Sequence, residues 1–591
     1  MTLTLSDLVT VRAVPAETGR LARHLGYLYG ESDERVILAA TCAITALSAG
    51  SVCFDLDQAA LLSFDADIPA GLGWPAPDEW VNALTVSPMV STDLAARDRP
   101  LVLDGRAVYL TRYWAEQEQI VGWLVPRLVP TGQTPDVPDD GLAATGPPAD
   151  PSQHQAVAMA ARSGFSVVAG GPGTGKTTVA AQILAALQQS SPEPLRVILT
   201  APTGRAAARL DQAVHENLHQ FPTSAGEPSD RRYTSGTLHR ILGVKPWGAV
   251  DHDAGHPLPA DVIVVDEASM LSLHLVALLL DAIPGPTRLI LLGDPDQLAS
   301  VEAGAVLADI VANAGLVSVT RLTHTYRFSG DIADLADAIR RGAADEALAV
   351  LHRSSDQIEW IPADTDAPGF SPDQLTSLRD DVTRQGLAMI DASTRGDAPE
   401  AIRLLNSHRL LLAHRHGLSG VSHWTHAVRG WIARNRGALA APWFAGLPIL
   451  VTRNDDLLGV FNGDSGVIVA EGTDLRLALD DGVGTRLIAP DMISSWEPLY
   501  ASTIHKAQGS QFDAVSLILP PATTALLTRE LFYTAVTRAK TFLRIVASPE
   551  AITHAITSPA LRASGLASRL ASLGTRSGAH SADPYHRDTN R

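Results

Sequence analysis

The stretch FSVVAGGPGTGKTTVAAQILAAL, residues 165–187, decides the fold of this 591-residue chain. The apolar run FSVVA predicts a buried strand, and TVAAQILAAL predicts the helix that follows it. Between them, GGPGTGKTT at 170–178 contains the pattern G-x-x-x-x-G-K-T, in the strand–loop–helix context that this motif requires. Glycines let backbone N–H groups turn onto phosphates, and the helix N-terminus adds a positive dipole. The stretch therefore predicts a P-loop that binds ATP.

Within this loop, the residue types indicate separate roles. Lys176 is expected to reach the β- and γ-phosphates, and the Thr177 hydroxyl to bind Mg²⁺. The expected nucleotide-contacting residues of the loop are Gly170, Gly171, Pro172, Gly173, Thr174, Gly175, Lys176, Thr177 and Thr178.

Two later apolar runs end in polar residues that suit the same chemistry. DVIVVDEASM ends its strand at Asp266 and Glu267, at the edge of a parallel sheet where ligands bind. Asp266 is expected to hold Mg²⁺ through water, and Glu267 to act as general base toward the attacking water. GDPDQL at 293–298 brings Gln297 to the position of the γ-phosphate. These residues predict an ATP-hydrolysing site.

Apolar runs and helical patterns alternate along most of the chain. RVILTA, DVIVVD and RLILLG follow the first strand, and a second set appears at 408–414, 516–520 and 542–548. Continuous Val/Ile/Leu strands separated by helices predict parallel sheets that are covered on both faces, hence an α/β fold. Shorter alternating strands and turns at about 443–490 predict a small β insertion in the second α/β domain.

The N-terminal part has a different texture. Residues 35–48 are helix-forming, and RPLVLDGRAVYLTRYW predicts a hairpin that turns at Asp104-Gly105, so the unit is mixed and mostly helical. A Pro/Gly/Asp-rich stretch separates it from the rest. The predicted divisions are an N-terminal partner-binding domain at 1–128, a linker at 129–150, motor domains at 151–335 and 336–572, and a disordered tail at 573–591.

Composition narrows the class of protein. The chain is 46% hydrophobic and 19% charged, with no apolar run that could span a membrane and no signal peptide, so we expect a cytoplasmic protein. The two cysteines, Cys42 and Cys53, are interpreted as buried thiols. The formal net charge of −18 argues against a surface coated in DNA, because DNA binding needs local cations. A narrow groove is still compatible with this charge.

The ordered motifs resemble a known family, the superfamily 1 helicases of the RecD type, which move 5′ to 3′ on single-stranded DNA. The motifs that carry the resemblance span roughly residues 150–550 and are GGPGTGKTT, LTAPTGRAA, TLHRILG, DEASM, GDPDQL, LTHTYRF, TIHKAQGSQFD and LFYTAVTRAK. LGYLYGESDERVILAATCAITALSAGSVCFDL and RPLVLDGRAVYLTRYW also resemble the RecD alpha subunits of RecBCD complexes (exodeoxyribonuclease V). The resemblance implies two RecA-like motor domains, with an SH3-like insertion in the second.

The resemblance also implies roles for individual residues. Gln153 would read adenine, and Arg327 and Arg538 would clamp the γ-phosphate from the second motor domain. Gln511 stands where the family usually has a Glu that hydrogen-bonds the nucleotide sugar, and an amide keeps an acceptor there. The expected DNA-contacting residues are Pro202, Thr203, Gly204, Arg205, Thr237, His239, Asn462, Thr503, His505 and Lys506.

Three hypotheses remain open at this stage. The first is an ATP-dependent helicase subunit that acts on single-stranded DNA and duplex ends together with RecB-like and RecC-like subunits in double-strand break repair, associated with the nucleoid when on DNA. The second is a stand-alone RecD-like helicase. The third is an assembly subunit with a silent ATPase, which the intact P-loop and carboxylates disfavour. The resemblance places nuclease activity in the beta subunit. Step size, processivity, responses to regulatory DNA sequences and the partner surface lie beyond the sequence.

Overall fold

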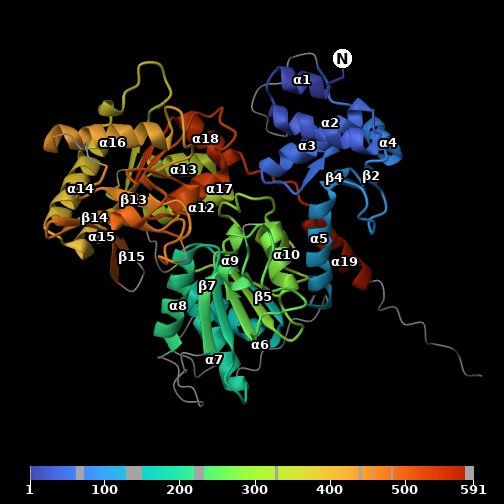
Figure 1. The fold of residues 1–591 in the computed structure, drawn as a ribbon, viewed down its shortest axis with the longest axis horizontal. Coiled ribbons are helices and arrows are strands. Elements are labelled where there is room, and N and C mark those ends of the chain that lie inside the picture. Colours follow the sequence, from blue (N-terminus) through green and yellow to red (C-terminus); the bar gives the residue numbers. More distant parts are fainter. Residues whose placement is uncertain are drawn as a thin grey trace, which may run out of the picture.

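The computed structural model describes residues 2–61, 72–127, 150–218, 232–245, 247–325, 330–353, 355–437, 442–455, 457–480 and 484–578. In Figure 1 the N-terminal unit is blue, the first motor domain is cyan to green, and the second motor domain is yellow to red. In this described part of the chain, no helix is long and apolar enough to cross a membrane.

The N-terminal unit packs helices on a small sheet. Its helices are α1 (Leu5–Thr10), α2 (Ala16–Tyr29), α3 (Glu34–Ser48) and α4 (Pro77–Val86). The sheet has the order β1 (Cys53–Asp55), β4 (Ala107–Leu110), β3 (Leu101–Asp104), β2 (Val90–Ser91). β3 and β4 are antiparallel and turn at Gly105, whose φ of 58° is left-handed, which confirms the predicted hairpin. α3 confirms the helix predicted at 35–48 and buries a face of small apolar residues in this unit.

The first motor domain is built on a fully parallel sheet. Its strand order is β10-β5-β9-β8-β6-β7, with bounds β5 (Phe165–Gly170), β6 (Val197–Ala201), β7 (Tyr233–Thr237), β8 (Val262–Val265), β9 (Arg288–Gly293) and β10 (Val319–Leu322). The helices are α6 (Pro151–Arg162), α7 (Lys176–Ser190), α8 (Gly204–Leu218), α9 (Leu238–Leu242), α10 (Leu273–Asp281) and α11 (Val306–Val311). Apolar clusters cover both faces of the sheet, as the continuous Val/Ile/Leu runs predict.

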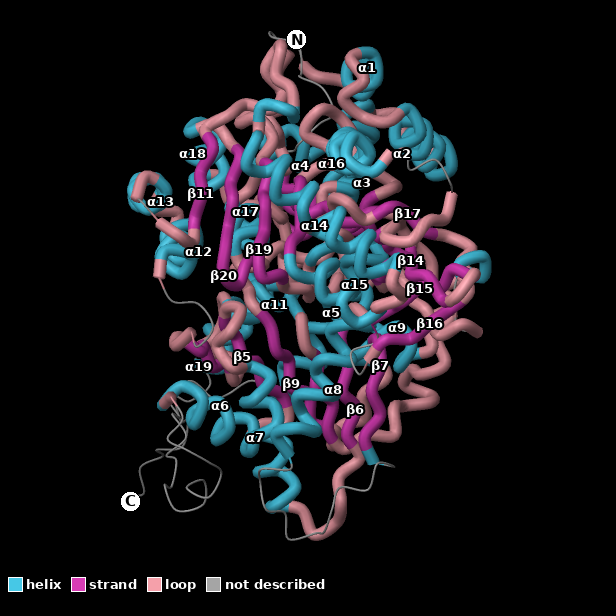
Figure 2. Tube along the Cα trace, turned by 90° about the vertical axis from the view of Figure 1, so that its left-hand side faces the viewer, coloured by secondary structure: helices cyan, strands magenta, loops and turns pink. Residues whose placement is uncertain are grey.

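A second parallel sheet forms the core of the second motor domain. Its order is β11-β20-β19-β12-β18, with bounds β11 (Ile358–Ile361), β12 (His408–Leu412), β18 (Ser502–Thr503), β19 (Phe512–Ile518) and β20 (Ala539–Val546). The helices around it are α12 (Asp331–Arg341), α13 (Ala344–Leu351), α14 (Thr376–Thr394), α15 (Ala398–Ser407), α16 (Val421–Arg436), α17 (Arg529–Val536) and α18 (Pro549–Thr557). Figure 2 shows the two parallel sheets one above the other. The predicted α/β class with two motor domains is confirmed.

The β insertion is an antiparallel sheet of its own. Its order is β16-β15-β14-β13-β17, with bounds β13 (Pro448–Val451), β14 (Ser465–Glu471), β15 (Asp474–Asp480), β16 (Thr485–Ile488) and β17 (Trp496–Pro498). The strand β17 lies past the expected end near residue 490, because it pairs with β13 and returns the chain to the motor domain.

Two helices join the units. α5 (Thr111–Leu124) leaves the N-terminal sheet and packs on α10, where Glu116 accepts a hydrogen bond of 2.8 Å from His274. α19 (Leu566–Gly578) lies beside α5, with Leu566 and Leu570 fully buried. α19 extends to Gly578, past residue 573 where the sequence predicts that order ends, because its apolar side chains are buried against α5. Residues 579–591 and most of the predicted linker lie outside the described residues.

Candidate ATP and DNA site

The P-loop follows β5 and ends at the start of α7. Gly173 and Gly175 have φ angles of 81° and 84°, which only glycine adopts without strain, so the loop can turn its N–H groups inward. The Lys176 ammonium donates to the carbonyl oxygens of Gly170 at 2.6 Å and Gly171 at 3.0 Å. Thr177 and Thr178 follow it in the first turn of α7. The Lys176 ammonium therefore lies beside a turn whose backbone N–H groups can bind an anion.

Gln153 lies behind the loop. The residue is on α6, buried, and its amide donates to the Thr174 carbonyl at 3.1 Å. The structure thus brings the expected adenine-reading side chain against the P-loop backbone, where it also fixes the loop's position.

The two predicted carboxylates follow β8 next to the P-loop. Burial and the neighbouring Glu267 carboxylate raise the pKa of Asp266 to about 6, and the Lys176 ammonium opposes this shift. Glu267 has a φ of 50°, one of two non-glycine residues with positive φ in the described chain. Such a conformation costs on the order of 1–3 kcal/mol and is concentrated at functional sites.

A chain of hydrogen bonds links the end of β9 to the second motor domain. The Gln297 amide donates to Asp294 at 3.0 Å, and the Tyr533 hydroxyl of α17 donates to the same carboxylate at 3.2 Å. The Arg538 guanidinium donates to the Gln297 side-chain oxygen at 3.1 Å. Burial raises the pKa of Asp294 and lowers that of Arg538. Contacts from both motor domains therefore meet beside the P-loop.

Arg538 is a buried cation whose partners are neutral. It is 2% exposed and donates to the backbone oxygens of Thr534 and Ser510, at 3.0 and 3.2 Å. Among the ion pairs of the described residues, none includes Arg538. The carboxylates of Glu267 and Asp294 act on this charge without forming an ion pair with it, so its burial is only partly compensated and the site favours an incoming anion.

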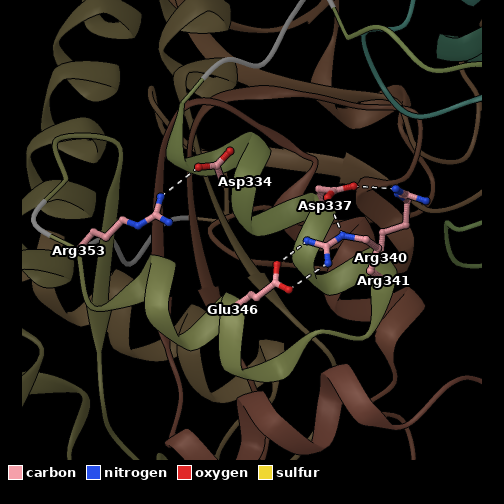
Figure 3. A network of polar contacts seen from close by, with 6 residues as sticks. All are labelled: Asp334, Asp337, Arg340, Arg341, Glu346 and Arg353. Carbon is pink, nitrogen blue, oxygen red and sulfur yellow. Dashed lines mark hydrogen bonds and ion pairs between the residues drawn. The ribbon is translucent and has the colours of Figure 1, made fainter.

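A cavity of about 230 Å³ opens beside the P-loop between the two motor domains. Gly170, Gly171 and Asp294 line one side, and Tyr533 and Arg340 line the other. Arg340 comes from α12, where Asp337 accepts a hydrogen bond of 2.6 Å from it, as Figure 3 shows.

Tyr533 and Arg340, which line this cavity, had no assigned role in the sequence. Tyr533 belongs to a quoted motif, so its aromatic hydroxyl near Arg538 was an available signal. Arg340 carries no such signal, because tertiary packing alone brings it to the cavity. Arg209, on α8, donates to the Gly509 carbonyl of the second motor domain at 2.5 Å. Arg327 lies outside the described residues.

The expected DNA-contacting residues gather where parallel strands end. Pro202, Thr203 and Gly204 follow β6. Thr237 ends β7 and His239 comes just after it, and Thr503 ends β18 with His505 and Lys506 just after it. Burial lowers the pKa of both His239 and His505. The Lys506 ammonium contacts Glu497 of the β insertion at 2.5 Å, and the Asn462 backbone N–H donates to Asn454 at 2.8 Å.

Arg205 takes part in a contact between units. Its guanidinium donates to Ser510 at 3.2 Å and to Ser465 of β14 at 3.0 Å, and lies 3.7 Å from Asp480 of β15. Burial lowers its pKa. The side chain therefore joins the first motor domain to the insertion, which is a different environment from an open phosphate contact.

Gln511 lines a separate cavity of about 530 Å³, together with Gly204, Arg205 and Thr237. This cavity lies between α8, the insertion and the second motor domain. The structure thus places Gln511 with the DNA-side residues, whereas the sequence assigned it to the nucleotide sugar. The cavity is rich in cations, since Arg209, Arg240, Arg486 and Lys540 also line it.

Comparison with known proteins covers nearly the whole chain. The RecBCD enzyme subunit RecD N-terminal domain matches residues 19–109, the AAA domain matches residues 148–362, and the UvrD-like helicase C-terminal domain matches residues 498–546. A RecBCD enzyme subunit RecD from Mycolicibacterium smegmatis is 42% identical over 95% of this chain and 98% of its own length. The Haemophilus influenzae protein of that name is 30% identical over 93% of this chain and 95% of its own length.

More distant similarities include a helicase with another name. The ATP-dependent RecD2 DNA helicase of Deinococcus radiodurans is 32% identical over 63% of this chain and 46% of its own length. A crystal structure of Bacteroides Pif1 bound to ssDNA covers 68% of this chain and 92% of its own, at 16% identity and a TM-score of 0.38.

Proposed function

Since the chain belongs to the RecD family of RecBCD enzyme subunits, and is an ATP-dependent DNA helicase of that type, we propose that it hydrolyses ATP between its two motor domains and moves 5′ to 3′ along single-stranded DNA. The observation that carries this mechanism is the buried Arg538, which the second motor domain presents to Gln297 of the first. A cation fixed by one domain beside the P-loop of the other couples closure of the cleft to phosphoryl transfer.

The P-loop binds the phosphates of ATP in this mechanism. Lys176 moves from the loop carbonyls to the β- and γ-phosphates, exchanging neutral acceptors for charged ones, which gives stronger hydrogen bonds. Gln153 holds the back of the loop and reads the base.

Thr177 and Asp266 fit a magnesium site. Hydroxyl and carboxylate oxygens are hard donors, and Mg²⁺ is usually held by one or two protein groups together with water and phosphate oxygens. The described residues hold no cluster of three or more His, Cys, Asp or Glu side chains that could bind a metal alone. Bound there, Mg²⁺ would neutralise charge on the transferring phosphoryl group.

Hydrolysis then needs a base and a charge clamp. Glu267 accepts a proton from the attacking water, and Gln297 positions that water or reports the γ-phosphate. Arg538 stabilises the charge that develops on the phosphate oxygens, because its desolvated guanidinium has only neutral partners. Arg327 would add a second clamp.

DNA would be held by the residues at the ends of β6, β7 and β18. Hydroxyl, amide and few cationic groups suit phosphate and sugar contacts that ignore base sequence. Opening and closing of the cleft then alternates the grip of the two motor domains. We propose that Arg205 chiefly connects the first motor domain to the β insertion and that DNA contact is its second role.

The partners follow from the family. We propose that RecB-like and RecC-like subunits bind this chain, that its N-terminal unit contributes to that contact, and that the complex acts in the cytoplasm, at the nucleoid, on duplex ends during double-strand break repair. Nuclease activity would reside in the RecB-like beta subunit.

Strand displacement tests the proposal. The purified chain is given duplexes that carry a 5′ or a 3′ single-stranded tail, with ATP and Mg²⁺, with and without co-expressed RecB-like and RecC-like subunits. If only the 5′-tailed duplex is unwound, the mechanism is supported. Unwinding of the 3′-tailed duplex contradicts the proposed 5′ to 3′ polarity.

The RecD2 similarity keeps a stand-alone helicase as the alternative. Co-expression separates the two: a stable heterotrimer whose DNA-dependent ATPase exceeds that of the chain alone supports the subunit role. A chain that stays unbound and is fully active alone supports the alternative.

A further inference from the structure

A second large cavity, of about 750 Å³, lies between the N-terminal unit and the second motor domain. Its volume is within the roughly 300–1,000 Å³ of ordinary ligand sites. Thr45, Ser48 and Ala49 at the end of α3 line it from one side, and residues 524–528, before α17, line it from the other. The segment between α18 and α19 closes a third side, seen in red beside the blue unit in Figure 1.

One wall of this cavity belongs to the proposed DNA path. His505, one of the residues expected to contact DNA after β18, lines the cavity together with His414, which follows β12. These are neighbouring strands of the second parallel sheet, so their carboxyl ends meet at the same edge. The cavity is thus continuous with the place where the second motor domain would hold a strand.

The lining has the chemistry of a site for single-stranded nucleic acid. Arg562 and His554 line it along with the two histidines above, and among the described lining residues Asp55 is the one acidic side chain. Arg562 is the one arginine or lysine among these residues, and burial lowers the pKa of His414 and His505, so the charge of the lining is nearly balanced. The Arg562 guanidinium and the hydroxyl groups can contact phosphates, and sequence-tolerant binding adds apolar contacts to the bases.

Two exposed apolar side chains supply such contacts. Leu526, before α17, is 48% exposed, Leu561, after α18, is 57% exposed, and both line the cavity. A leucine exposed to this extent inside a cavity gains from covering, and a base face would cover it.

The cavity wall is also firmly built. The Ala563 carbonyl accepts from the Val52 N–H at 2.8 Å, and Arg562 donates to the Ser300 carbonyl at 2.7 Å. Ser564 donates to Asp309 at 2.7 Å. The segment between α18 and α19 therefore connects the N-terminal unit to both motor domains and holds the wall of the cavity that this unit forms.

We propose that the N-terminal unit roofs the DNA path, so that single-stranded DNA runs through this cavity between α3 and the second motor domain. The inference rests on the proposed DNA role of the residues after β18. It adds a binding site on a unit that carries none of the helicase motifs and turns an open groove into a channel.

Cross-linking gives the direct test, because both native cysteines are buried. The full chain carries Ala49→Cys, labelled with a benzophenone maleimide, and is irradiated with 5′-labelled oligo(dT). Thr85→Cys, on an exposed position of α4 away from the cavity, is the matched control. We expect DNA adducts from position 49 and none above background from position 85. Equal yields at both positions, or adducts at 49 to a partner subunit instead of DNA, overturn the proposal.

A charge swap at one site supplies the second readout. Ser48 is exposed and lines the cavity, so we expect Ser48→Glu and Ser48→Lys to fold and to differ chiefly in charge. By fluorescence anisotropy, we expect Ser48→Glu to bind oligo(dT) at least about fivefold more weakly than Ser48→Lys. The difference in affinity between the two variants should be largest at low salt. Equal affinities contradict the proposal.

Thr503→Ala separates this failure from failure of the proposed function. One outcome is that Thr503→Ala weakens DNA binding while position 49 gives no DNA adducts and the two position 48 variants bind equally. In that case the proposed DNA-binding function stands, and the proposed path of DNA beneath the N-terminal unit is wrong. If Thr503→Ala has no effect, the proposed DNA path itself is wrong.

Discussion

At the scale of single residues, the site depends on charges placed against their solvation preference. Arg538 is buried among neutral oxygens, Asp266 is desolvated beside Glu267, and Glu267 occupies a left-handed backbone conformation. The first two arrangements are unfavourable in the protein alone, and in the proposed mechanism a magnesium-bound triphosphate would supply the missing opposite charges. Individual substitutions should therefore affect catalysis and stability in opposite directions.

Glu267→Gln removes the base but keeps the shape of the side chain. We expect DNA-stimulated ATP hydrolysis to fall by roughly 10²–10⁴-fold, the usual contribution of a general base, with ATP binding retained. Steady-state turnover and binding of a fluorescent ATP analogue measure the two effects. A variant that keeps wild-type turnover would show that another group takes the proton.

Lys176→Ala removes the cation that reaches the phosphates. Binding of ATP should weaken and hydrolysis should become undetectable, while the fold persists because the Lys176 ammonium contacts only loop carbonyls. The same two assays apply, with thermal unfolding as the control. Unchanged affinity for ATP contradicts the role given to this residue.

The buried Asp266 makes a prediction about pH. Its pKa is raised from 3.8 to about 6, so the folded state holds a proton that the unfolded chain releases between these values, and the protein loses stability as pH rises through this window. Asp266→Asn should therefore raise the free energy of unfolding at pH 8 by roughly 1–3 kcal/mol, from about 1.4 kcal/mol per pKa unit, and leave it little changed at pH 4.

The same variant should lose ATP hydrolysis, because the carboxylate that holds Mg²⁺ is gone. Denaturant titrations at the two pH values measure the stability effect. If Asp266→Asn is less stable than the wild type at pH 8, the raised pKa of Asp266 is contradicted.

At the scale of helices and strands, α19 shows how a terminal segment is ordered by a distant one. Leu570 is fully buried against the α5 region, whereas the Arg569 ion pair with Glu118 is partly exposed. Leu570→Ala should reduce the free energy of unfolding by about 2–4 kcal/mol through lost burial and a cavity. Arg569→Ala should cost about 1 kcal/mol or less. Chemical denaturation ranks the two, and a reversed order contradicts the packing.

The elements that could be predicted from sequence are those with a local signature. The P-loop, the carboxylates after β8 and the hairpin at Gly105 depend on patterns within a few residues, and the parallel strands on continuous apolar runs. The docking of α19 on α5 and the place of Gln511 depend on contacts between segments that are far apart in the sequence. No local pattern of residues marks such contacts. Arg340 reaches the cleft in the same way, so no motif marked it.

At the scale of the whole molecule, the two motor domains meet through side chains that belong to the chemistry. The Leu298 N–H donates to Thr534 at 2.8 Å, and the Gln508 amide donates to the Leu298 carbonyl at 2.7 Å, next to the Gln297–Arg538 contact. Any change in the nucleotide at the P-loop must therefore alter the contact between domains. In the proposed mechanism, this coupling converts hydrolysis into movement along DNA.

The most direct measurement of this claim is DNA-stimulated ATP hydrolysis by Arg538→Ala, with ATP binding measured in parallel. A composite site predicts that turnover falls by about 10³-fold or more, the effect of losing an arginine that stabilises the transferring phosphate. ATP binding should stay within a few fold, because the P-loop is intact, and strand displacement should stop. Near wild-type turnover in this variant would contradict the account, since the first motor domain would then hydrolyse ATP without the second.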